Sequence, residues 1–194
     1  SADKKAPAED ILSVDMPEQK EVSLPTAPKP KPPADRVYLD PSKLKDGISG
    51  LRIACILDEF SFASYAPEAS FTQLTPENWA RELEACQPDL LFVESAWRGK
   101  DDLWGSKVGH CASELQGIVA WCRAKAVPTA FWNKEDPVHF ETFINTAHLF
   151  DYVFTTDIDC IHRYKGILGH DRVHLLPFAC QPRQHNPIET YPRK

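Results

Sequence analysis

Residues 129–139 read Thr-Ala-Phe-Trp-Asn-Lys-Glu-Asp-Pro-Val-His. The apolar start of this stretch predicts a buried strand that stops at Asn133. Three charged residues follow at once, namely Lys134, Glu135 and Asp136. Pro137 is typical of the first turn of a helix. Because ligands of open α/β sheets bind outside the carboxyl ends of the strands, this strand-to-helix turn predicts a binding site.

On both sides of this turn, short apolar runs alternate with segments of 3.6-residue periodicity. This alternation is typical of βα units around a mostly parallel sheet. We predict five strands, at residues 52–57, 89–94, 128–132, 152–155 and 173–176. The fold class expected is therefore a Rossmann-like three-layer α/β/α domain over residues 47–188.

Helices are predicted between these strands. Thr75 before Pro76 is expected to cap the first of them. Three helices carry an apolar stripe, made of Trp79, Leu83 and Cys86, of Leu115, Ile118, Val119, Cys122 and Ala126, and of Phe140, Phe143, Ile144 and Ala147. A fourth helix is expected from near Asp157 to a point between Gly166 and Gly169. We interpret the stripes as core positions, with no need for a cofactor.

Residues 1–46 differ in composition from the rest of the chain. Eight of the 17 prolines fall at or before Pro41, and Phe and Trp are absent there. Such a segment buries too little apolar surface to offset the entropy of ordering it. We therefore expect a disordered Pro/Lys-rich linker over residues 1–46, which tethers the domain to something upstream, and the start of an interdomain linker at residues 189–194.

The charge and cysteine content exclude several classes of protein. The net charge is −6, with 22 Lys and Arg against 28 Asp and Glu, which disfavours binding to nucleic acid. No apolar run reaches the roughly 18 residues of a transmembrane segment. The six cysteines lie far apart, without zinc-ligand spacing, so we expect free thiols, no metal site and a cytoplasmic location.

Four segments together resemble one protein family. They are residues 87–97 (Gln-Pro-Asp-Leu-Leu-Phe-Val-Glu-Ser-Ala-Trp), 127–137 (Val-Pro-Thr-Ala-Phe-Trp-Asn-Lys-Glu-Asp-Pro), 150–157 (Phe-Asp-Tyr-Val-Phe-Thr-Thr-Asp) and 173–179 (Val-His-Leu-Leu-Pro-Phe-Ala). In this order they resemble the amino-terminal domain of GT-B-type glycosyltransferases, specifically the spore-maturation (CgeB-like) family of bacterial surface-polysaccharide and protein-glycosylation systems. The resemblance covers about residues 51–188.

The resemblance implies transfer of a sugar from a nucleotide-sugar donor to an acceptor hydroxyl, without an essential metal or other cofactor. Two Rossmann-like domains face each other in that family. The first mainly holds the acceptor, which is a glycan, a lipid-linked molecule or a protein, and the second holds the donor. Since Lys194 stands where the second domain should begin, we expect this chain alone to be inactive or nearly so.

Acidic residues at the predicted strand ends are candidates for the general base that such a transfer needs. Glu135, Asp58 and Glu59 are the catalytic candidates. Glu94 would be costly to bury alone, so it should pair with Lys134 or Arg98, in a structural bridge or in the site. For Asp136 the main alternative is a role as helix N-cap, and Asp157 has the same alternative.

Aromatic residues near the strand ends are candidates to stack on sugar rings. Trp97 and Trp104 lie in a loop that looks too polar to be core, whereas Trp132 is either core or site. The predicted substrate-binding set is Phe60, Tyr65, Glu94, Trp97, Arg98, Trp104, Trp132, Asn133, Lys134, Asp136 and His139. We also expect the first and second predicted strands to be neighbours, so that residues 58–65 and 94–98 form the walls of the crevice.

Two other hypotheses remain open. The first is a non-catalytic module of the same fold that binds a glycan or a protein. The second is a flavodoxin-like or response-regulator-type domain, which explains acids at strand ends but does not predict the aromatic loops.

Overall fold

A six-stranded, all-parallel sheet forms the centre of the computed structural model, which describes residues 38–45 and 47–185. The strands are β1 Arg52–Ile56, β2 Ser70–Gln73, β3 Leu90–Glu94, β4 Thr129–Asn133, β5 Tyr152–Thr155 and β6 Val173–Leu175. The α-helices are α1 Glu59–Tyr65, α2 Trp79–Cys86, α3 Ser113–Ala124, α4 Phe140–Ala147 and α5 Cys160–Leu168. Short 3-10 helices are η1 Pro41–Leu44, η2 Ile48–Gly50 and η3 Lys100–Asp102. The predicted Rossmann-like α/β fold class is confirmed.

The strands lie in the order β2-β1-β3-β4-β5-β6. The expected neighbourhood of the first and second predicted strands is confirmed, because β1 pairs with β3 in a register that sets Ile56 beside Val93. Strand order reverses between β1 and β3, and such a switch point is where open α/β sheets bind ligands. The first five strands share the order of flavodoxin-like domains.

The sheet has one strand more than we predicted. Strand β2 pairs in parallel with β1 and forms one edge of the sheet, with Ser70 exposed and Phe71, Thr72 and Gln73 half-buried. An edge strand of mixed polarity has no continuous apolar run, because only one side of it faces the core. The pattern that located the other five strands was therefore absent here.

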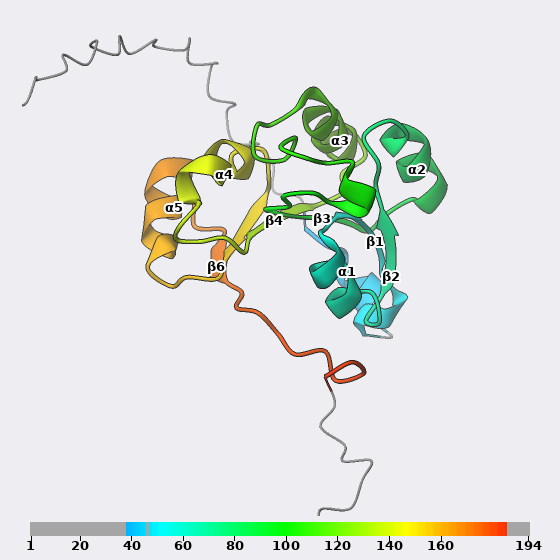
Figure 1. Ribbon diagram of the computed structural model, residues 1–194. Helices are drawn as coiled ribbons and strands as arrows, with labels where there is room; N and C mark the ends of the chain where they lie inside the picture. Colours follow the sequence, from blue (N-terminus) through cyan, green and yellow to red (C-terminus); the bar gives the residue numbers. More distant parts are fainter. Residues whose placement is uncertain (1–37, 46, 186–194) are drawn as a thin grey trace, which may run out of the picture.

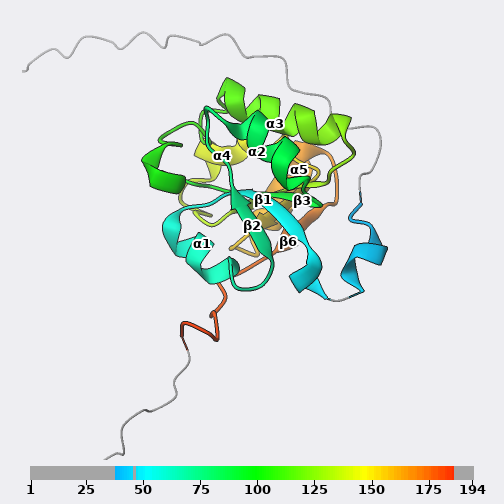
Figure 2. The same ribbon diagram turned by 90° about the vertical axis from the view of Figure 1, so that its right-hand side faces the viewer.

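The two faces of the sheet are covered unequally. Helices α2, α3, α4 and α5 lie on one face, and α1 lies on the other (Figures 1 and 2). The larger core, under the four helices, contains Leu83, Ile118, Phe131 and Phe143. The smaller core, on the α1 side, contains Trp132 with Phe62 and Tyr65 of α1 packed against it. The predicted apolar stripes face the larger core as expected, although Trp79 and Cys86 are only partly buried, and Ala126 is exposed beyond the end of α3.

Three predicted helix caps are wrong. Helix α2 begins at Trp79, α4 at Phe140 and α5 at Cys160, each a few residues later than predicted. In each case a turn precedes the helix. The Asp157 carboxylate accepts from the Asp159 N–H within that turn, whereas the other two expected caps bind elsewhere. Thr75 pairs with the Glu82 carboxylate, and Asp136 binds side chains of β4, β5 and α5.

Part of the predicted linker belongs to the domain. Residues 1–37, residue 46 and residues 186–194 lie outside the described residues, so the linker prediction cannot be followed there. In residues 38–45, however, Lys43 forms an ion pair with the buried Asp89, and Leu39 packs against the sheet. The domain therefore starts earlier than residue 47.

All six cysteines are free thiols. Cys55, Cys122 and Cys160 are buried, and Cys180 is exposed. Within residues 38–45 and 47–185, no helix has the length and apolarity to cross a membrane.

Candidate functional site

An open cleft of about 1010 Å³ lies beyond the carboxyl ends of β1, β3 and β4, at the switch point of the sheet. Its walls come from three segments that the sequence placed at strand ends: residues 58–60 after β1, residues 97–102 after β3, and Lys134 after β4. Gln73 at the end of β2 completes the lining. The structure thus brings six of the predicted site residues into one cleft: Asp58, Glu59, Phe60, Trp97, Arg98 and Lys134.

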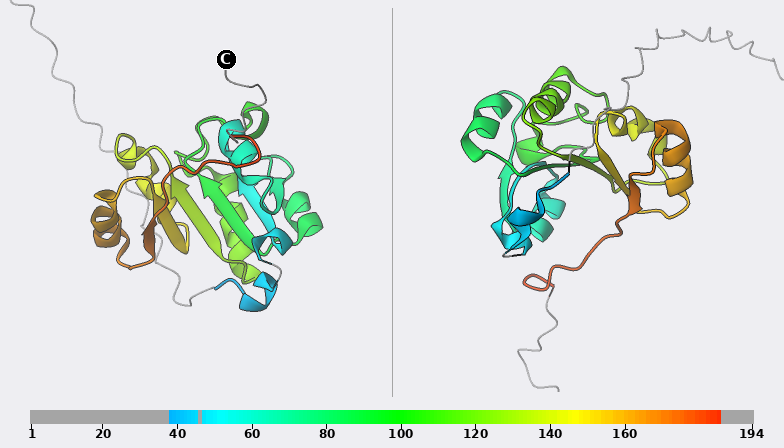
Figure 3. Two further views of the ribbon diagram at one scale, coloured as in Figure 1. Left: turned by 90° about the horizontal axis from the view of Figure 1, so that it is seen from below. Right: turned by 180° about the vertical axis from the view of Figure 1, so that it is seen from behind.

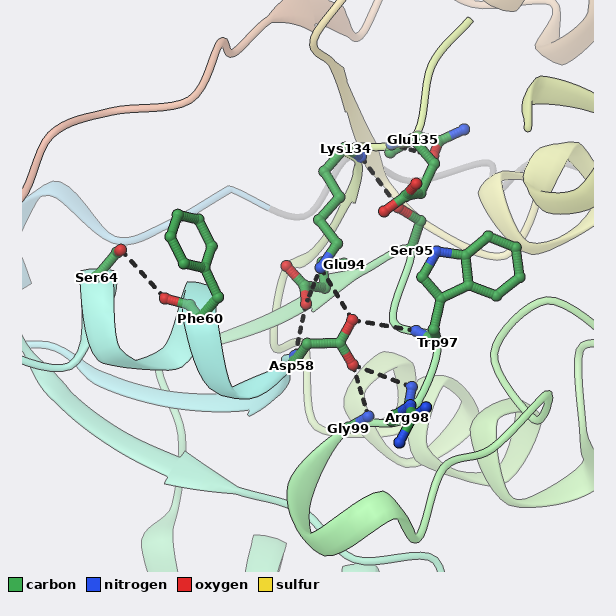
Figure 4. Close-up of polar contacts among 11 residues, drawn as sticks. Asp58, Phe60, Ser64, Glu94, Ser95, Trp97, Arg98, Gly99, Lys134 and Glu135 are labelled. Atoms are coloured by element: carbon green, nitrogen blue, oxygen red, sulfur yellow. Dashed lines mark hydrogen bonds and ion pairs between the residues drawn. The ribbon is translucent and has the colours of Figure 1, made fainter. Parts of the chain in front are cut away.

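Lys134 links two carboxylates at the base of the cleft. Its Nζ lies 2.9 Å from Oδ2 of Asp58 and 3.0 Å from Oε1 of Glu94 (Figure 4). Glu94 is fully buried, as the sequence suggested, and its partner is Lys134 rather than Arg98. The Lys134 backbone N–H donates to Ser95 Oγ at 3.0 Å, which fixes the start of the turn after β4 against β3.

Asp58, which follows β1, holds the loop after β3 in place. Its carboxylate accepts hydrogen bonds from three successive backbone N–H groups, at 3.2 Å from Trp97, 3.0 Å from Arg98 and 2.7 Å from Gly99 (Figure 4). Successive N–H groups of this kind form a concave site for an anion. Here the anion is a side chain of the same chain, so Asp58 organises the cleft wall.

The loop owes its shape to Gly99 and Trp104. Gly99 has φ of +64°, and a Cβ placed there would lie 2.6 Å from the Trp104 side chain. Trp104 was predicted to stack on a substrate; that prediction is wrong, because it is fully buried and its indole N–H donates to the Leu74 carbonyl at 2.8 Å. The polar composition of the loop suggested that all of it is exposed, but one buried indole is enough to anchor a polar loop to the core.

The charges in this cluster support one another. Burial raises the pKa of Asp58, but the Gly99 amide, Lys134 and the Arg98 amide outweigh it and hold the pKa below its ordinary value. Burial lowers the pKa of Lys134, and the negative charges of Glu94 and Asp58 more than reverse the effect. Burial raises the pKa of Glu94 despite the opposing charge of Lys134. Lys134 is therefore a permanent cation shared by two acids.

Asp136 forms a second cluster behind the cleft. It accepts hydrogen bonds from Asn133 Nδ2 at 2.7 Å, from Thr155 Oγ1 at 2.6 Å and from the Tyr164 hydroxyl at 3.3 Å. Burial raises its pKa to about 6, although Thr155 and Tyr164 oppose the shift. Asn133 is fully buried in the same network. Asp136 and Asn133 therefore join β4, β5 and α5, and the structure does not bring them into the cleft lining.

The aromatic candidates fall into two groups. Trp97 is 40% exposed on the cleft wall, and its ring contacts His139 at 4.9 Å and Phe143 at 5.4 Å between centroids. His139 thus packs against the Trp97 ring and is not among the residues that line the cleft. Phe60 is 61% exposed at the cleft, whereas Trp132 is buried in the smaller core and contacts Tyr65.

The remaining acidic candidates are free of internal partners. The Glu59 carboxylate is exposed at the start of α1 and borders the cleft. Glu135 is half-buried beside Lys134, and its backbone N–H donates to Asn133 Oδ1. Within the described residues, neither carboxylate makes a hydrogen bond or an ion pair. Both could accept a proton from a ligand.

Comparison of the chain with protein-family models, curated proteins and solved structures finds no match. The chemistry of the site must therefore be argued from its own residues. In the described part of the chain, no three His, Cys, Asp or Glu side chains are grouped so that they could hold a metal ion.

Sequence reasoning missed a second pocket, of about 280 Å³, beside the cleft. Residues 176–185, here called the strap, leave β6 and cross the sheet to α1, as the left view of Figure 3 shows. The Gln181 side chain donates to the Ser64 carbonyl and to Glu68 Oε1, and Gln184 donates to the Ala63 carbonyl. The pocket lies between strap and helix. Three of its lining residues, Phe60, Tyr65 and Trp132, were substrate-binding candidates from the sequence, but the closure of a pocket over them by the strap was not predicted.

Proposed function

We propose that this chain forms the acceptor-side domain of a GT-B-type glycosyltransferase that transfers a sugar from a nucleotide-sugar to an acceptor hydroxyl. The observation that carries the proposal is the open cleft at the switch point, which combines free carboxylates with exposed aromatic faces. The sequence resemblance to the CgeB-like family points to the same reaction. The donor would be held by a second domain that closes over this edge of the sheet.

The exposed apolar side chains support such a closure. Six of the large exposed ones follow the carboxyl ends of strands: Phe60, Trp97, Leu103, Val138, Ile158 and Phe178. Exposed apolar groups around a polar cleft mark a surface that contacts another domain or molecule. A covered cleft would also exclude water, which a transfer reaction requires if hydrolysis of the donor is to be avoided.

The general base of the transfer is Glu59 in this proposal, with Glu135 as the alternative. Asp58 is unsuited to the role, because its oxygens already accept four hydrogen bonds and its pKa is lowered. Glu94 is unsuited because it is fully buried. Glu59 borders the cleft with a free carboxylate and can reach an acceptor hydroxyl, as a general base must.

The test uses the complete natural protein that carries this domain, incubated with a panel of nucleotide-sugars. We expect release of the nucleotide from at least one donor. Glu59→Gln should reduce that rate at least about 100-fold, the usual contribution of a general base, while Glu141→Gln, an exposed control on α4, should not change it. Loss of activity in Glu135→Gln alone would move the role to Glu135. The absence of turnover with every donor would refute the transferase.

A non-catalytic glycan-binding module is the second candidate. It is favoured by one observation: Asp58 and Glu94, two of the acids at the strand ends, are committed to Lys134. Saccharide binding without turnover of any nucleotide-sugar by the complete protein would support this module over the enzyme. In either case we place the protein in the cytoplasm, since six unpaired thiols fit a reducing compartment.

A further inference from the structure

The pocket between α1 and the strap has aromatic walls. Phe60, Tyr65, Trp132 and Phe178 line it, and Phe178 contacts Trp132 at 5.3 Å and Phe60 at 6.4 Å between ring centroids. The indole N–H of Trp132 donates to the Leu176 carbonyl, so its polar edge is occupied and the ring offers only apolar surface. At about 280 Å³ the pocket is near the lower limit of ligand sites, which suits one ring rather than a large molecule.

One carboxylate stands in this aromatic setting. The Ser61 hydroxyl is fully buried and faces the Glu94 carboxylate, so it is not offered to a ligand. Among the described residues that line the pocket, Glu68 is the only charged one. Its carboxylate accepts one bond from Gln181 and has capacity for further donors.

This combination selects the class of ligand. A phosphate, carboxylate or nucleotide would meet the negative charge of Glu68, with no Lys, Arg or His in the described part of the lining to offset it. An alkyl chain would cover Glu68 without giving it a hydrogen bond. A neutral sugar ring avoids both costs, because its hydroxyls can donate to Glu68 while its C–H faces pack on the aromatic rings.

We propose that the pocket between α1 and the strap binds one uncharged sugar ring of the acceptor, next to the ring that receives the transferred sugar. Calling this ring part of an acceptor rests on the proposed function. The binding of the ring itself does not require turnover. Phe60 borders both the pocket and the cleft, so a ring in the pocket is adjacent to the Glu59 side of the cleft. The pocket would therefore set a preference for an acceptor in which the ring beside the acceptor ring is uncharged.

The test measures binding of uncharged methyl glycosides to this 194-residue chain by saturation-transfer NMR and by titration of tryptophan fluorescence. We expect weak, saturable binding of at least one glycoside. Phe178→Ala should weaken it about tenfold, because it removes a wall of the pocket that is itself 56% exposed. Val138→Ala is the matched control: Val138 is 81% exposed at the same edge of the sheet, outside the pocket, and its removal should leave the affinity unchanged.

Binding of an uncharged alkyl probe in place of every glycoside would overturn the proposal in favour of an apolar ligand. Equal affinity in the wild type and in Phe178→Ala would overturn it as well.

These results are separable from the test of the proposed function. Nucleotide-sugar turnover by the complete protein with no glycoside binding in the pocket would refute this inference alone. Glycoside binding that is lost in Phe178→Ala, with no turnover of any donor, would refute the transferase and leave the sugar-binding pocket standing.

Discussion

Lys134 and Asp58 meet across β3, with Nζ of one 2.9 Å from Oδ2 of the other, although 76 positions separate them in the sequence. Lys134 follows β4 and Asp58 follows β1, and both strands pair with β3. The same ammonium group lies 3.0 Å from the buried Glu94. The charged cluster at the base of the cleft therefore exists only because β1, β3 and β4 are paired side by side.

Replacing Lys134 should destabilise the fold. In Lys134→Met the buried Glu94 loses its counter-charge, and breaking a buried ion pair costs about 3–5 kcal/mol. Urea unfolding at neutral pH measures this loss. Lys165→Met, which removes an exposed ion pair with Asp171, should cost less than about 1 kcal/mol. The double variant Lys134→Met/Glu94→Gln should recover part of the stability, and no recovery would contradict the role given to Lys134.

Gly99 should be far less replaceable than Gly169. Both have positive φ, of +64° and +72°, so alanine is strained at either position. At Gly169 nothing lies within 4 Å of the added Cβ, whereas at Gly99 it meets Trp104 at 2.6 Å. We expect Gly169→Ala to cost about 1 kcal/mol and Gly99→Ala to cost about 2–4 kcal/mol. Equal losses in thermal unfolding would show that Trp104 yields to the extra atom.

Asp58 should control the mobility of the loop after β3. In Asp58→Asn the side chain loses its charge, and an NH₂ group replaces one of the acceptor oxygens. The amides of Trp97, Arg98 and Gly99 should then exchange with solvent at least about tenfold faster, as expected when a charge-assisted hydrogen bond is lost. Hydrogen exchange followed by NMR measures this directly. Glu59→Gln should leave these amides unchanged, because the Glu59 side chain does not contact them.

Asp136 should make stability depend on pH near 6. Its pKa in the fold is about 6, above the value of an unfolded Asp, so the folded state binds the proton more tightly. Its contribution to stability is therefore fully present below the unfolded pKa and falls as pH rises through 6. In Asp136→Asn this dependence disappears. The difference in free energy of unfolding between Asp136→Asn and the wild type should grow in favour of the variant between about pH 4 and 6 and level off above about pH 7, and a flat difference from about pH 4 to 6 would count against the assignment.

The sequence predicted the sheet wherever burial left a continuous apolar run. Residues 129–133 are buried without exception and were found, whereas Ser70–Gln73 is a half-exposed edge strand and was not. The partner of a side chain was predictable only where a buried charge required one. Buried Glu94 required a cation, and Lys134 was one of two named.

The remaining site residues depended on contacts that a sequence does not contain. Trp104 lies in a polar loop, but it fills the space beneath Gly99 and is core. The sequence position of Asp136 is typical of a helix cap, but its carboxylate accepts hydrogen bonds from side chains of β5 and α5 instead. Ser61 and Phe178 belong to one pocket only because the strap crosses the sheet, and nothing near either residue announces that crossing.

The 76-residue separation between Lys134 and Asp58 also concerns how the domain folds. Bringing together two residues so far apart in the sequence has an entropic cost, because the chain between them must be closed into a loop. We therefore expect this contact to form only once β1, β3 and β4 are in register. A partly folded chain therefore has no cleft with which to bind a ligand. Every ligand that binds only the folded cleft must raise the melting temperature, by an amount that grows with the logarithm of one plus the ratio of ligand concentration to Kd, so thermal stability itself can report which compounds the site accepts.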